Sequence, residues 1–468
     1  PCGARRHMTY DIAAAFAAHA AETRYENLPP AALRAAKTFL LDTLGVGLAG
    51  SSGANVRAVC DLARSWGPGE ESTAWLDGSR MSAGSAAIVN AYLIHCLEFD
   101  CVHEGAVVHP MATLLSALLA WSEREAARGR PVDGKRLVTA MAVGVDVAGL
   151  LGVATDSPLR FFRPATAGGF GATAGIASLA GFDAATIRSA FGHMYGQTCG
   201  TLQPHLEGSP LLGLQIGFNA RGAIAAADLA AAGMQGPVDV FTGRYGYYTL
   251  IEDGQLHADR IEAALGREWQ ITQLAHKPFP SGRLTHGVVH GLRDLMARHG
   301  FAPDDIAEVV CRVPPLVRRL VGRPDVPDPA SNYAKLCLPF VAGVYLAKGR
   351  CDVPDFRGDA LRDPRVHHFA AKVRHEPDGN TDENALDPQY IEVRLASGAV
   401  HGIHLAHVYG HPEAALTEAE NEEKFFRCCR HAEPTVPEAR ARRLRDMVAG
   451  VEGLADVSAL VATLAARD

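Results

Sequence analysis

The chain has 468 residues, of which 48% are hydrophobic and 21% are charged, with 45 Lys and Arg against 52 Asp and Glu. This length favours two domains over one compact core, and the apolar content excludes wholesale disorder. A formal net charge of −7 gives no general attraction for nucleic acid or for an anionic membrane surface, so we expect neither as a partner.

The predicted elements are helical over the first part of the chain. Ala- and Leu-rich segments with charges at helical intervals predict a closely packed bundle. The expected helices cover residues 10–21, 30–44, 82–99, 111–127, 134–149, 165–179, 184–198 and 211–232. None of the longest apolar stretches reaches the roughly 20 uninterrupted residues of a membrane helix. The first ten residues lack the apolar core of a secretory signal, and we expect Met8 to be the native start.

The pattern changes near Trp269. Residues 269–274, 308–313, 390–395 and 400–405 are expected as strands, with helices over 287–298 and 333–347. Residues 418–464 return to helical periodicity. We therefore predict a mainly α protein in which a large all-helical domain (8–266, completed by 406–468) carries an inserted, smaller α/β lid domain (267–405).

The GxGxxG stretch and the cysteines are better explained by packing and burial than by a nucleotide site or disulfide bonds. Residues 45–50 match the GxGxxG pattern of dinucleotide sites, but they lie in a predicted helix with no strand before them, so we interpret the glycines as close helix packing. The ten cysteines are scattered without a CxxC pair. That distribution indicates buried thiols in a reducing cytoplasm rather than a disulfide framework.

The densest ionisable group lies at the end of the helix predicted over 82–99. Three histidines and three carboxylates fall within fifteen positions, namely His95, Glu98, Asp100, His103, Glu104 and His109. An apolar helix seldom ends this way unless it opens on a pocket, although a solvated helix end with one core histidine is the alternative. A metal site on His95, His103 and His109 is the lesser option, because spacings of eight and six fix no coordination geometry. We therefore expect no metal.

Two further segments offer cations. Arg163 precedes a Gly/Ala-rich helix whose free N–H groups suit an anionic oxygen, although pairing with an acid would explain it equally well. Residues 276–286 form a proline-fixed loop that carries Lys277, Ser281, Arg283 and His286, and we expect it to bind a carboxylate. Bases and cations without a nucleophile triad or a phosphate loop fit removal of a proton next to a carboxylate.

These motifs resemble the MmgE/PrpD family. Residues 90–100 with Val108-His109-Pro110 are similar to the family's His-x-Leu-Asp-Phe-Asp-Asp pattern and its following His-Pro, and residues 162–171, 277–286 and 410–412 correspond in the same order. The resemblance implies a helical domain with an α/β lid, a homodimer, and a cofactor-free site between the domains. The family includes 2-methylcitrate dehydratase, cis-aconitate decarboxylase and iminodisuccinate epimerase, so it implies a small di- or tricarboxylate as substrate.

The resemblance also implies roles for individual residues. His109 and His286 are candidates for general acid and base, Glu98 and Asp100 would orient them or share protons, and His103 is a further candidate. The expected substrate contacts are Arg163, Lys277, Arg283, Ser281 and Gln215.

Departures from the family pattern bear on the reaction. Cys101 and Val102 replace an acid and a threonine, while Leu212 and Leu320 match the positions of a lysine and a tyrosine. The histidine of the decarboxylase's Phe-His-Pro is Arg163. These changes argue against cis-aconitate decarboxylation. The retained groups suffice for dehydration or for epimerisation, and we slightly favour a dehydratase-like lyase. An epimerase of an iminodisuccinate-like dicarboxylate and a catalytically inactive metabolite-binding homologue are the alternatives.

Overall fold

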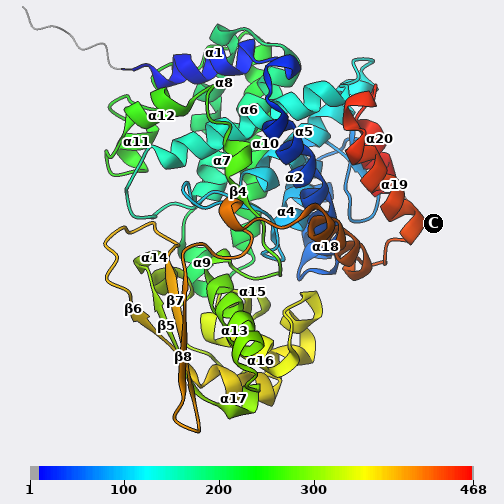
Figure 1. The fold of residues 1–468 in the computed structure, drawn as a ribbon. Coiled ribbons are helices and arrows are strands. Elements are labelled where there is room, and N and C mark those ends of the chain that lie inside the picture. The colour runs from blue at the N-terminus through cyan, green and yellow to red at the C-terminus, as the bar shows by residue number, and fades with distance from the viewer. Residues whose placement is uncertain (1–9, 466–468) are drawn as a thin grey trace, which may run out of the picture.

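The computed structural model describes residues 10–465, so the expected start at Met8 lies outside the described residues. Within them the fold is mainly α, as predicted, with a smaller α/β region below the helices in Figure 1. The first twelve helices are α1 (Ile12–Glu22), α2 (Pro30–Ala49), α3 (Val56–Ser65), α4 (Ala83–His95), α5 (Pro110–Ala127), α6 (Gly134–Val153), α7 (Arg163–Ala180), α8 (Ala184–Tyr195), α9 (Gln203–Glu207), α10 (Leu211–Ala231), α11 (Tyr247–Leu250) and α12 (Ala258–Ala264).

The α/β region is built around one four-stranded sheet in the order β6-β5-β7-β8. Its strands are β5 (Ile306–Val313), β6 (Val373–Pro377), β7 (Gln389–Leu395) and β8 (Val400–Leu405), and only the β5–β6 pair is parallel. The accompanying helices are α13 (His286–His299), α14 (Pro315–Val321), α15 (Ser331–Lys335), α16 (Leu338–Lys348) and α17 (Pro364–Ala370). Helix α13 packs on β7 so closely that a Cβ at Gly291 would lie 2.6 Å from Ile391.

Two of the predicted elements in this region are wrong. The strand expected over 269–274 is mostly a 3₁₀ turn, Gln270–Gln273, because the Gln270 amide donates to the buried carboxylate of Asp146 at 2.7 Å. The helix expected over 333–347 is two helices, because Pro339 lies in the first turn of α16 and cannot donate the hydrogen bond that would continue α15. The edge strand β6 was not predicted from its short pattern.

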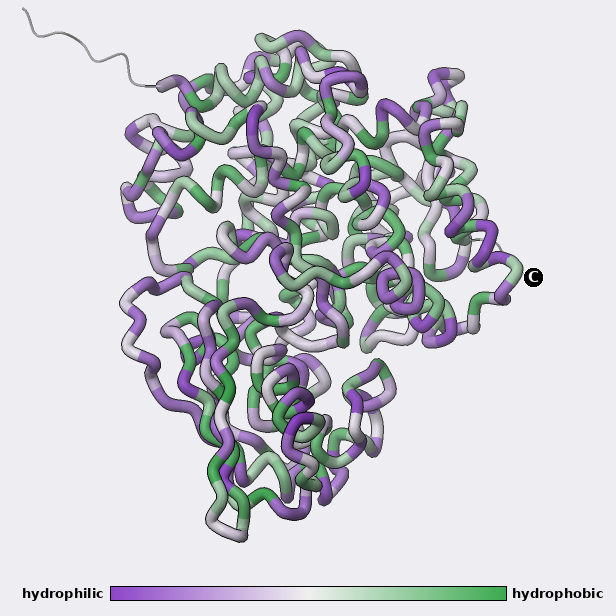
Figure 2. The backbone as a smooth tube through the Cα atoms, in the orientation of Figure 1, coloured by the Kyte–Doolittle hydropathy of each residue, from purple (hydrophilic) through white to green (hydrophobic). Residues whose placement is uncertain are grey.

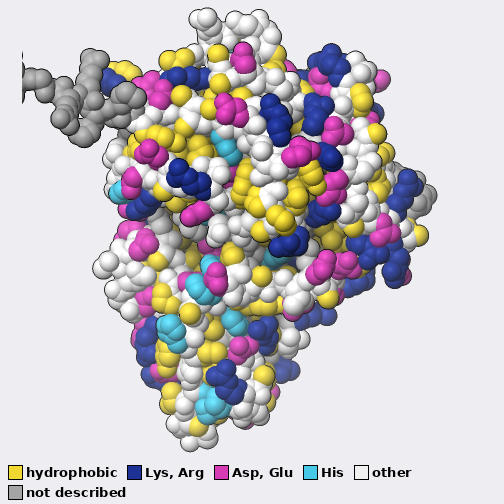
Figure 3. All heavy atoms as spheres, turned by 45° about the horizontal axis from the view of Figure 1, so that its top comes forward, with side chains coloured by type: hydrophobic (Ala, Val, Ile, Leu, Met, Phe, Trp, Pro, Cys, Tyr) yellow, Lys and Arg dark blue, Asp and Glu magenta, His cyan; other side chains and the backbone are white. Residues whose placement is uncertain are grey.

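Buried hydrophobic residues form two cores. The first is built mainly from Ile12 to Leu274 and again from Phe425 to Leu464, and the second mainly from Leu284 to Val408. Hydrophobic residues gather along the helices in the middle of the larger part, here called the helical domain (Figure 2). The smaller part, with the second core, is called the lid domain. On the face shown in Figure 3 acidic and basic side chains are interspersed rather than separated by sign.

A short antiparallel pairing connects the helical domain to the chain that enters the lid. Strand β3 (Val102–His103) follows α4, and it pairs with β4 (Leu274–Ala275), which directly precedes the lid loop. Val102 lies opposite Ala275, and His103 lies opposite Leu274. This register brings Lys277 beside the segment between α4 and β3. A second minor pair, β1 (Ser72–Thr73) with β2 (Arg80–Met81), lies within the helical domain.

The C-terminal helices α18 (Glu418–His431), α19 (Glu438–Ala449) and α20 (Ser458–Leu464) return to the helical domain, where α18 packs on α2 (Figure 1) and α20 lies against α5. Gly45 of α2 lets α18 approach, because a Cβ there would lie 2.9 Å from the Phe425 ring. A Cβ at Gly50 would lie 1.9 Å from the Leu93 carbonyl oxygen. The glycines of the GxGxxG stretch thus serve close packing.

Helix α6 is long and apolar enough to cross a membrane by length and composition alone. In the structure, 89% of its most apolar window is buried against other helices. That environment is the one expected for a core helix.

Lys424 of α18 carries a buried positive charge, and we predict that removing this charge lowers the stability of the folded protein. Lys424 lies 2.6 Å from Asp42, and both side chains are almost fully buried. Lys424→Met leaves Asp42 as an uncompensated buried charge, so we expect unfolding free energy to fall by about 3–5 kcal/mol in denaturant titrations. Arg442→Met breaks the exposed Arg442–Glu438 pair of α19 and should cost less than about 0.5 kcal/mol. Equal losses in the two variants would contradict this account.

Candidate active site

The candidate site begins where α4 ends. Ser82 caps the start of this buried apolar helix, and the helix stops at His95 rather than continuing to residue 99 as predicted. Residues 96–101, here called the acidic loop, are irregular, and Glu98 has a φ of 52°. A residue other than glycine in the left-handed region costs conformational energy, and such residues are concentrated at functional sites.

Three buried lysines from separate parts of the chain hold the acidic loop. Two come from the lid domain and one from α18, so the loop forms its complete set of contacts only when these segments are docked. Lys277 donates to Glu98 Oε2 at 2.9 Å, Lys335 to the carbonyl of Cys96 at 2.9 Å and Lys424 to the carbonyl of Phe99 at 2.9 Å.

Two histidines complete a buried charge cluster around the loop. His95 Nδ1 lies 3.1 Å from Asp100 Oδ2, and His95 Nε2 lies 3.3 Å from Glu98 Oε1. His109 Nδ1 lies 3.3 Å from the same Asp100 oxygen, and Lys277 Nζ lies 3.8 Å from the other. Asp100 therefore sits between two imidazoles and an ammonium group.

The cluster shifts the pKa values of its two histidines in opposite directions. Burial alone would lower the pKa of His95, but the carboxylates of Asp100 and Glu98 outweigh it and raise that pKa to about 9. Burial and then the Lys277 charge lower the pKa of His109 below its ordinary value, despite the opposing effect of Asp100. Burial would raise the pKa values of Glu98 and Asp100, yet their cationic neighbours hold both well below the ordinary range. At neutral pH, His95 is cationic and His109 is neutral.

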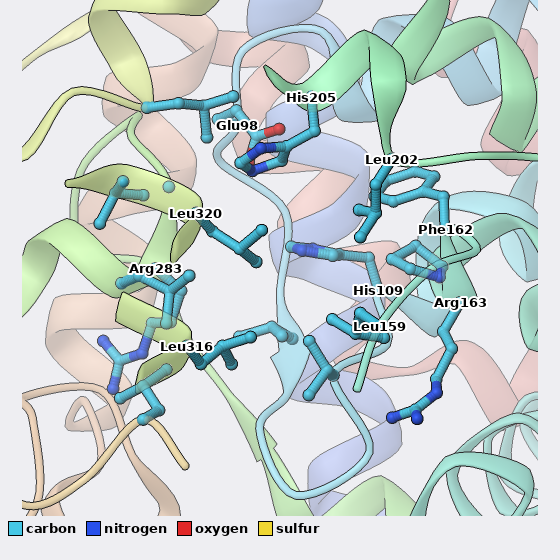
Figure 4. Close-up of a pocket in the computed structure, with 18 of the residues that line it drawn as sticks. Glu98, His109, Leu159, Phe162, Arg163, Leu202, His205, Arg283, Leu316 and Leu320 are labelled. Atoms are coloured by element: carbon cyan, nitrogen blue, oxygen red, sulfur yellow. The ribbon is translucent and has the colours of Figure 1, made fainter. Parts of the chain in front are cut away.

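Hydrogen bonds assign the tautomer of His109. Its Nδ1 lies 3.1 Å from the carbonyl oxygen of Cys101, which can only accept, so the proton belongs on Nδ1. The unprotonated Nε2 is then left for the cavity, into which the ring projects in Figure 4. A neutral imidazole held by a carboxylate and with one free lone pair is the arrangement of a general base.

The cavity lies between the two domains and has an empty volume of about 660 Å³. Helical-domain residues such as Glu98, His109 and Phe162 line it together with lid residues such as Arg283 and Leu320. Figure 4 shows Leu320 across from His109, with Leu316 and Leu159 further along the wall.

His205 lines the same cavity and was not predicted as a site residue. It lies in the short helix α9, where Arg323 donates to its Nδ1 at 3.2 Å, so the imidazole proton belongs on Nε2. Burial and the Arg323 charge lower the pKa of His205 to about 4, which keeps it neutral. The only sequence signal is a proline-histidine pair between two Gly/Ala-rich helices, which is too common a pattern to single out.

Two of the predicted carboxylate-binding arginines are engaged by acids within the protein. Arg163 is buried, donates to both oxygens of Glu252 at 2.9 and 2.8 Å, and turns its guanidinium away from His109 in Figure 4. Arg283 donates to Glu104 and to the carbonyls of Val408 and Tyr409. Both residues line the cavity, but substrate binding by either stays a prediction.

The remaining predicted residues lie around the site in other contacts. His103 uses both ring nitrogens, on Gln270 and on the Ala106 amide, and Gln215 bonds the Thr201 backbone through both amide atoms. Ser281 shares a hydrogen bond with Thr285. His286 stacks on Phe279, approaches the Ser281 carbonyl and lines a different cavity. The structure therefore places Glu98, Asp100, His109 and Lys277 in one cluster, and the roles of the other candidates stay predictions.

In the described part of the chain, two groups of three residues place possible metal-ligand atoms within 4.8 Å of one another. The first group is His95, Asp100 and His109, and the second is Asp387, His407 and His411. In the first, Lys277 and the cationic His95 already balance the carboxylates. A divalent cation there would add like charge to a desolvated cluster, which makes this group a poor metal site. His103 lies in neither group.

Residues 14–258 match the MmgE/PrpD N-terminal domain, and residues 279–452 match the MmgE/PrpD C-terminal domain. The chain belongs to the MmgE/PrpD family. It is 28% identical over 441 residues to the human cis-aconitate decarboxylase, covering 89% of this chain and 88% of that protein.

Two other MmgE/PrpD relatives carry the same name. The chain is 26% identical to the mouse cis-aconitate decarboxylase, with 89% and 86% of the two chains covered. It is 23% identical to the Aspergillus terreus cis-aconitate decarboxylase, with 83% and 82% covered. The family predicted from the sequence motifs is thus confirmed over both domains.

The raised pKa of His95 predicts a pH-dependent stability. A group whose pKa rises on folding contributes stability that is complete below its unfolded value, near 6.5, and is lost as pH rises through about 9. We expect the melting temperature to fall between pH 6.5 and 9, and His95→Gln to flatten that fall. His193→Gln, on α8, is the control and should keep the wild-type slope. Parallel slopes for all three proteins would contradict the charge assignment.

Proposed function

We propose that this MmgE/PrpD protein is a cofactor-free enzyme that removes a proton next to a carboxylate of a small di- or tricarboxylate, with a dehydratase-like lyase reaction slightly favoured. The observation that carries the proposal is the neutral His109, whose Nδ1 is held by Asp100 and Cys101 while its other nitrogen is free for the interdomain cavity. The names of the relatives support a lyase and a carboxylate substrate.

In the proposed reaction His109 Nε2 takes the proton from the carbon next to the carboxylate. The electron pair of the broken C–H bond moves toward that carboxylate, and the Nε2–H of neutral His205 is suited to donate to a developing negative oxygen. In dehydration the same pair forms the C=C bond as hydroxide leaves. The imidazolium formed at His109 can return its proton to that hydroxide, which departs as water.

Epimerisation is the second candidate, and the presence of His205 favours it. An epimerase needs a base and a proton donor at one carbon, and both His109 and His205 line the cavity from different elements; as the donor, His205 would first have to take up a proton from solvent in each turnover. The inactive binding homologue stays an alternative because Cys101, Val102 and Leu212 replace family groups. The predicted homodimer and cytoplasmic location remain proposals.

If His109 is the base, a substrate hydrogen next to a carboxylate should exchange with solvent deuterium. The tricarboxylates citrate, 2-methylcitrate and cis-aconitate, the dicarboxylate iminodisuccinate and the alkyl-substituted dicarboxylate 2-isobutylsuccinate are each incubated with the enzyme in heavy water and followed by NMR. We expect one of them to gain deuterium beside a carboxylate, and His109→Asn to slow that exchange at least 10²-fold, as is typical for loss of a general base. Loss of water identifies the lyase, and an inverted centre the epimerase.

The control for this experiment is His193→Asn, which changes a histidine on α8 that bonds the Met234 carbonyl. It should exchange at the wild-type rate. A folded His109→Asn variant with undiminished exchange would rule out His109 as the base, and binding without exchange in the wild type would favour the inactive homologue.

The lowered pKa of His109 predicts the pH dependence of turnover. A base must be unprotonated, so the acidic limb of kcat/KM should lie below pH 6.5. Lys277 helps to lower this pKa, so Lys277→Met should move the limb to higher pH, while the charge-conserving Lys277→Arg should move it less. Profiles are compared only for variants that keep cooperative unfolding. An unmoved limb in an active Lys277→Met enzyme would contradict the proposed coupling.

A further inference from the structure

The charged side chains that line the interdomain cavity are already paired within the protein. Each carboxylate or guanidinium on the wall has an opposite charge within ion-pair distance, so no side chain on the wall offers an unbalanced cation. The pairs are Glu98 with Lys277, Glu104 with Arg283, and Arg163 with Glu252. The two lining histidines, His109 and His205, are neutral by their lowered pKa values.

The charge cluster behind the cavity is net positive. Its ion-paired members are Lys277 and the protonated His95 as cations and Glu98 and Asp100 as anions. Lys335 is buried and donates to the Cys96 carbonyl; burial lowers its pKa, and it interacts with Glu98. Arg323, which donates to His205, also interacts with Glu98. This surplus of positive groups attracts a ligand carboxylate.

The rest of the wall is apolar, and both domains contribute to it. Leu159 and Leu202 come from the helical domain, while Leu316, Leu320 and Leu386 come from the lid part of the chain. Figure 4 shows Leu202, Leu316 and Leu320 around the volume that His109 enters. A carboxylate placed against these leucines would lose its water without gaining a partner, which is strongly unfavourable.

We infer that the substrate carries an apolar substituent where a compact tricarboxylate carries its third carboxylate. One carboxylate is attracted by the cluster, a second can accept from the Nε2–H of neutral His205, and an alkyl group fills the leucine wall. This inference rests on the proposed function for the reacting carbon and narrows its substrate class to alkyl-substituted dicarboxylates.

A matched pair of ligands tests this substrate class. 2-Isobutylsuccinate and tricarballylate differ only in the end of one arm, where an isopropyl group replaces a carboxylate of nearly the same shape. We expect isothermal titration of the whole protein to give at least ten-fold tighter binding of 2-isobutylsuccinate. Tighter binding of tricarballylate, or no binding of 2-isobutylsuccinate up to 10 mM, would overturn the inference; the ~10 mM ceiling exceeds typical KM values.

Leu320→Gln tests whether the leucine wall causes the preference. We expect this variant to reduce the preference to less than three-fold, whereas Leu62→Gln, which changes an exposed leucine of α3, should keep it. An unchanged preference in folded Leu320→Gln would overturn the assignment of the wall. If Leu320→Gln does not fold, the matched pair on the wild-type protein still decides the substrate class.

Deuterium exchange on the same two ligands separates this inference from the proposed function. Tight binding of 2-isobutylsuccinate without exchange beside its carboxylates would support the substrate class and count against the proton-abstraction function. Exchange and tighter binding of tricarballylate would support the function and overturn the substrate class.

Discussion

The buried carboxylates of the acidic loop impose the constraint on which the rest of the site depends. Asp100 is fully buried and Glu98 nearly so, and a desolvated carboxylate is tolerated only when cations and hydrogen bonds compensate it. The compensation comes from Lys277 of the lid loop and from His95 at the end of α4. The need to pair these charges therefore ties the lid domain to the helical domain, and the β3–β4 pairing sets the register in which they meet.

The same buried charges give the histidines around the site different protonation states. His95 and His109 contact one carboxylate, yet the first lies between two acids and becomes cationic, while the second feels Lys277 and burial and stays neutral. His205 is kept neutral by a different cation, Arg323, which also selects its tautomer. The two neutral imidazoles therefore offer different groups to one cavity: His109 presents a lone pair, and His205 presents an N–H.

Much of this arrangement could be predicted because the signals are local. Helical periodicity located the long helices, the alternation at 390–405 located β7 and β8, and the acids and histidines of residues 95–109 are neighbours in the sequence. The pairing of cations with acids could not be predicted, since Arg163 meets Glu252 and Arg283 meets Glu104 only after the chain has folded. His205 was missed for the same reason: its environment comes from Arg323, which is 118 positions away.

The three lysines that donate to the acidic loop are synthesised after the loop, one after another. Relative to their partners in the loop they lie 179, 239 and 325 positions further along the chain. A ribosome adds on the order of 5–20 residues per second, so the loop leaves the tunnel several seconds before Lys277, the ion-pair partner of Glu98, has been made. Until then the carboxylate of Glu98 must stay hydrated, and the end of α4 cannot dehydrate ahead of the lid loop. The candidate site consequently reaches its final packing only after the lid loop has been made, although its acids are translated well before that loop.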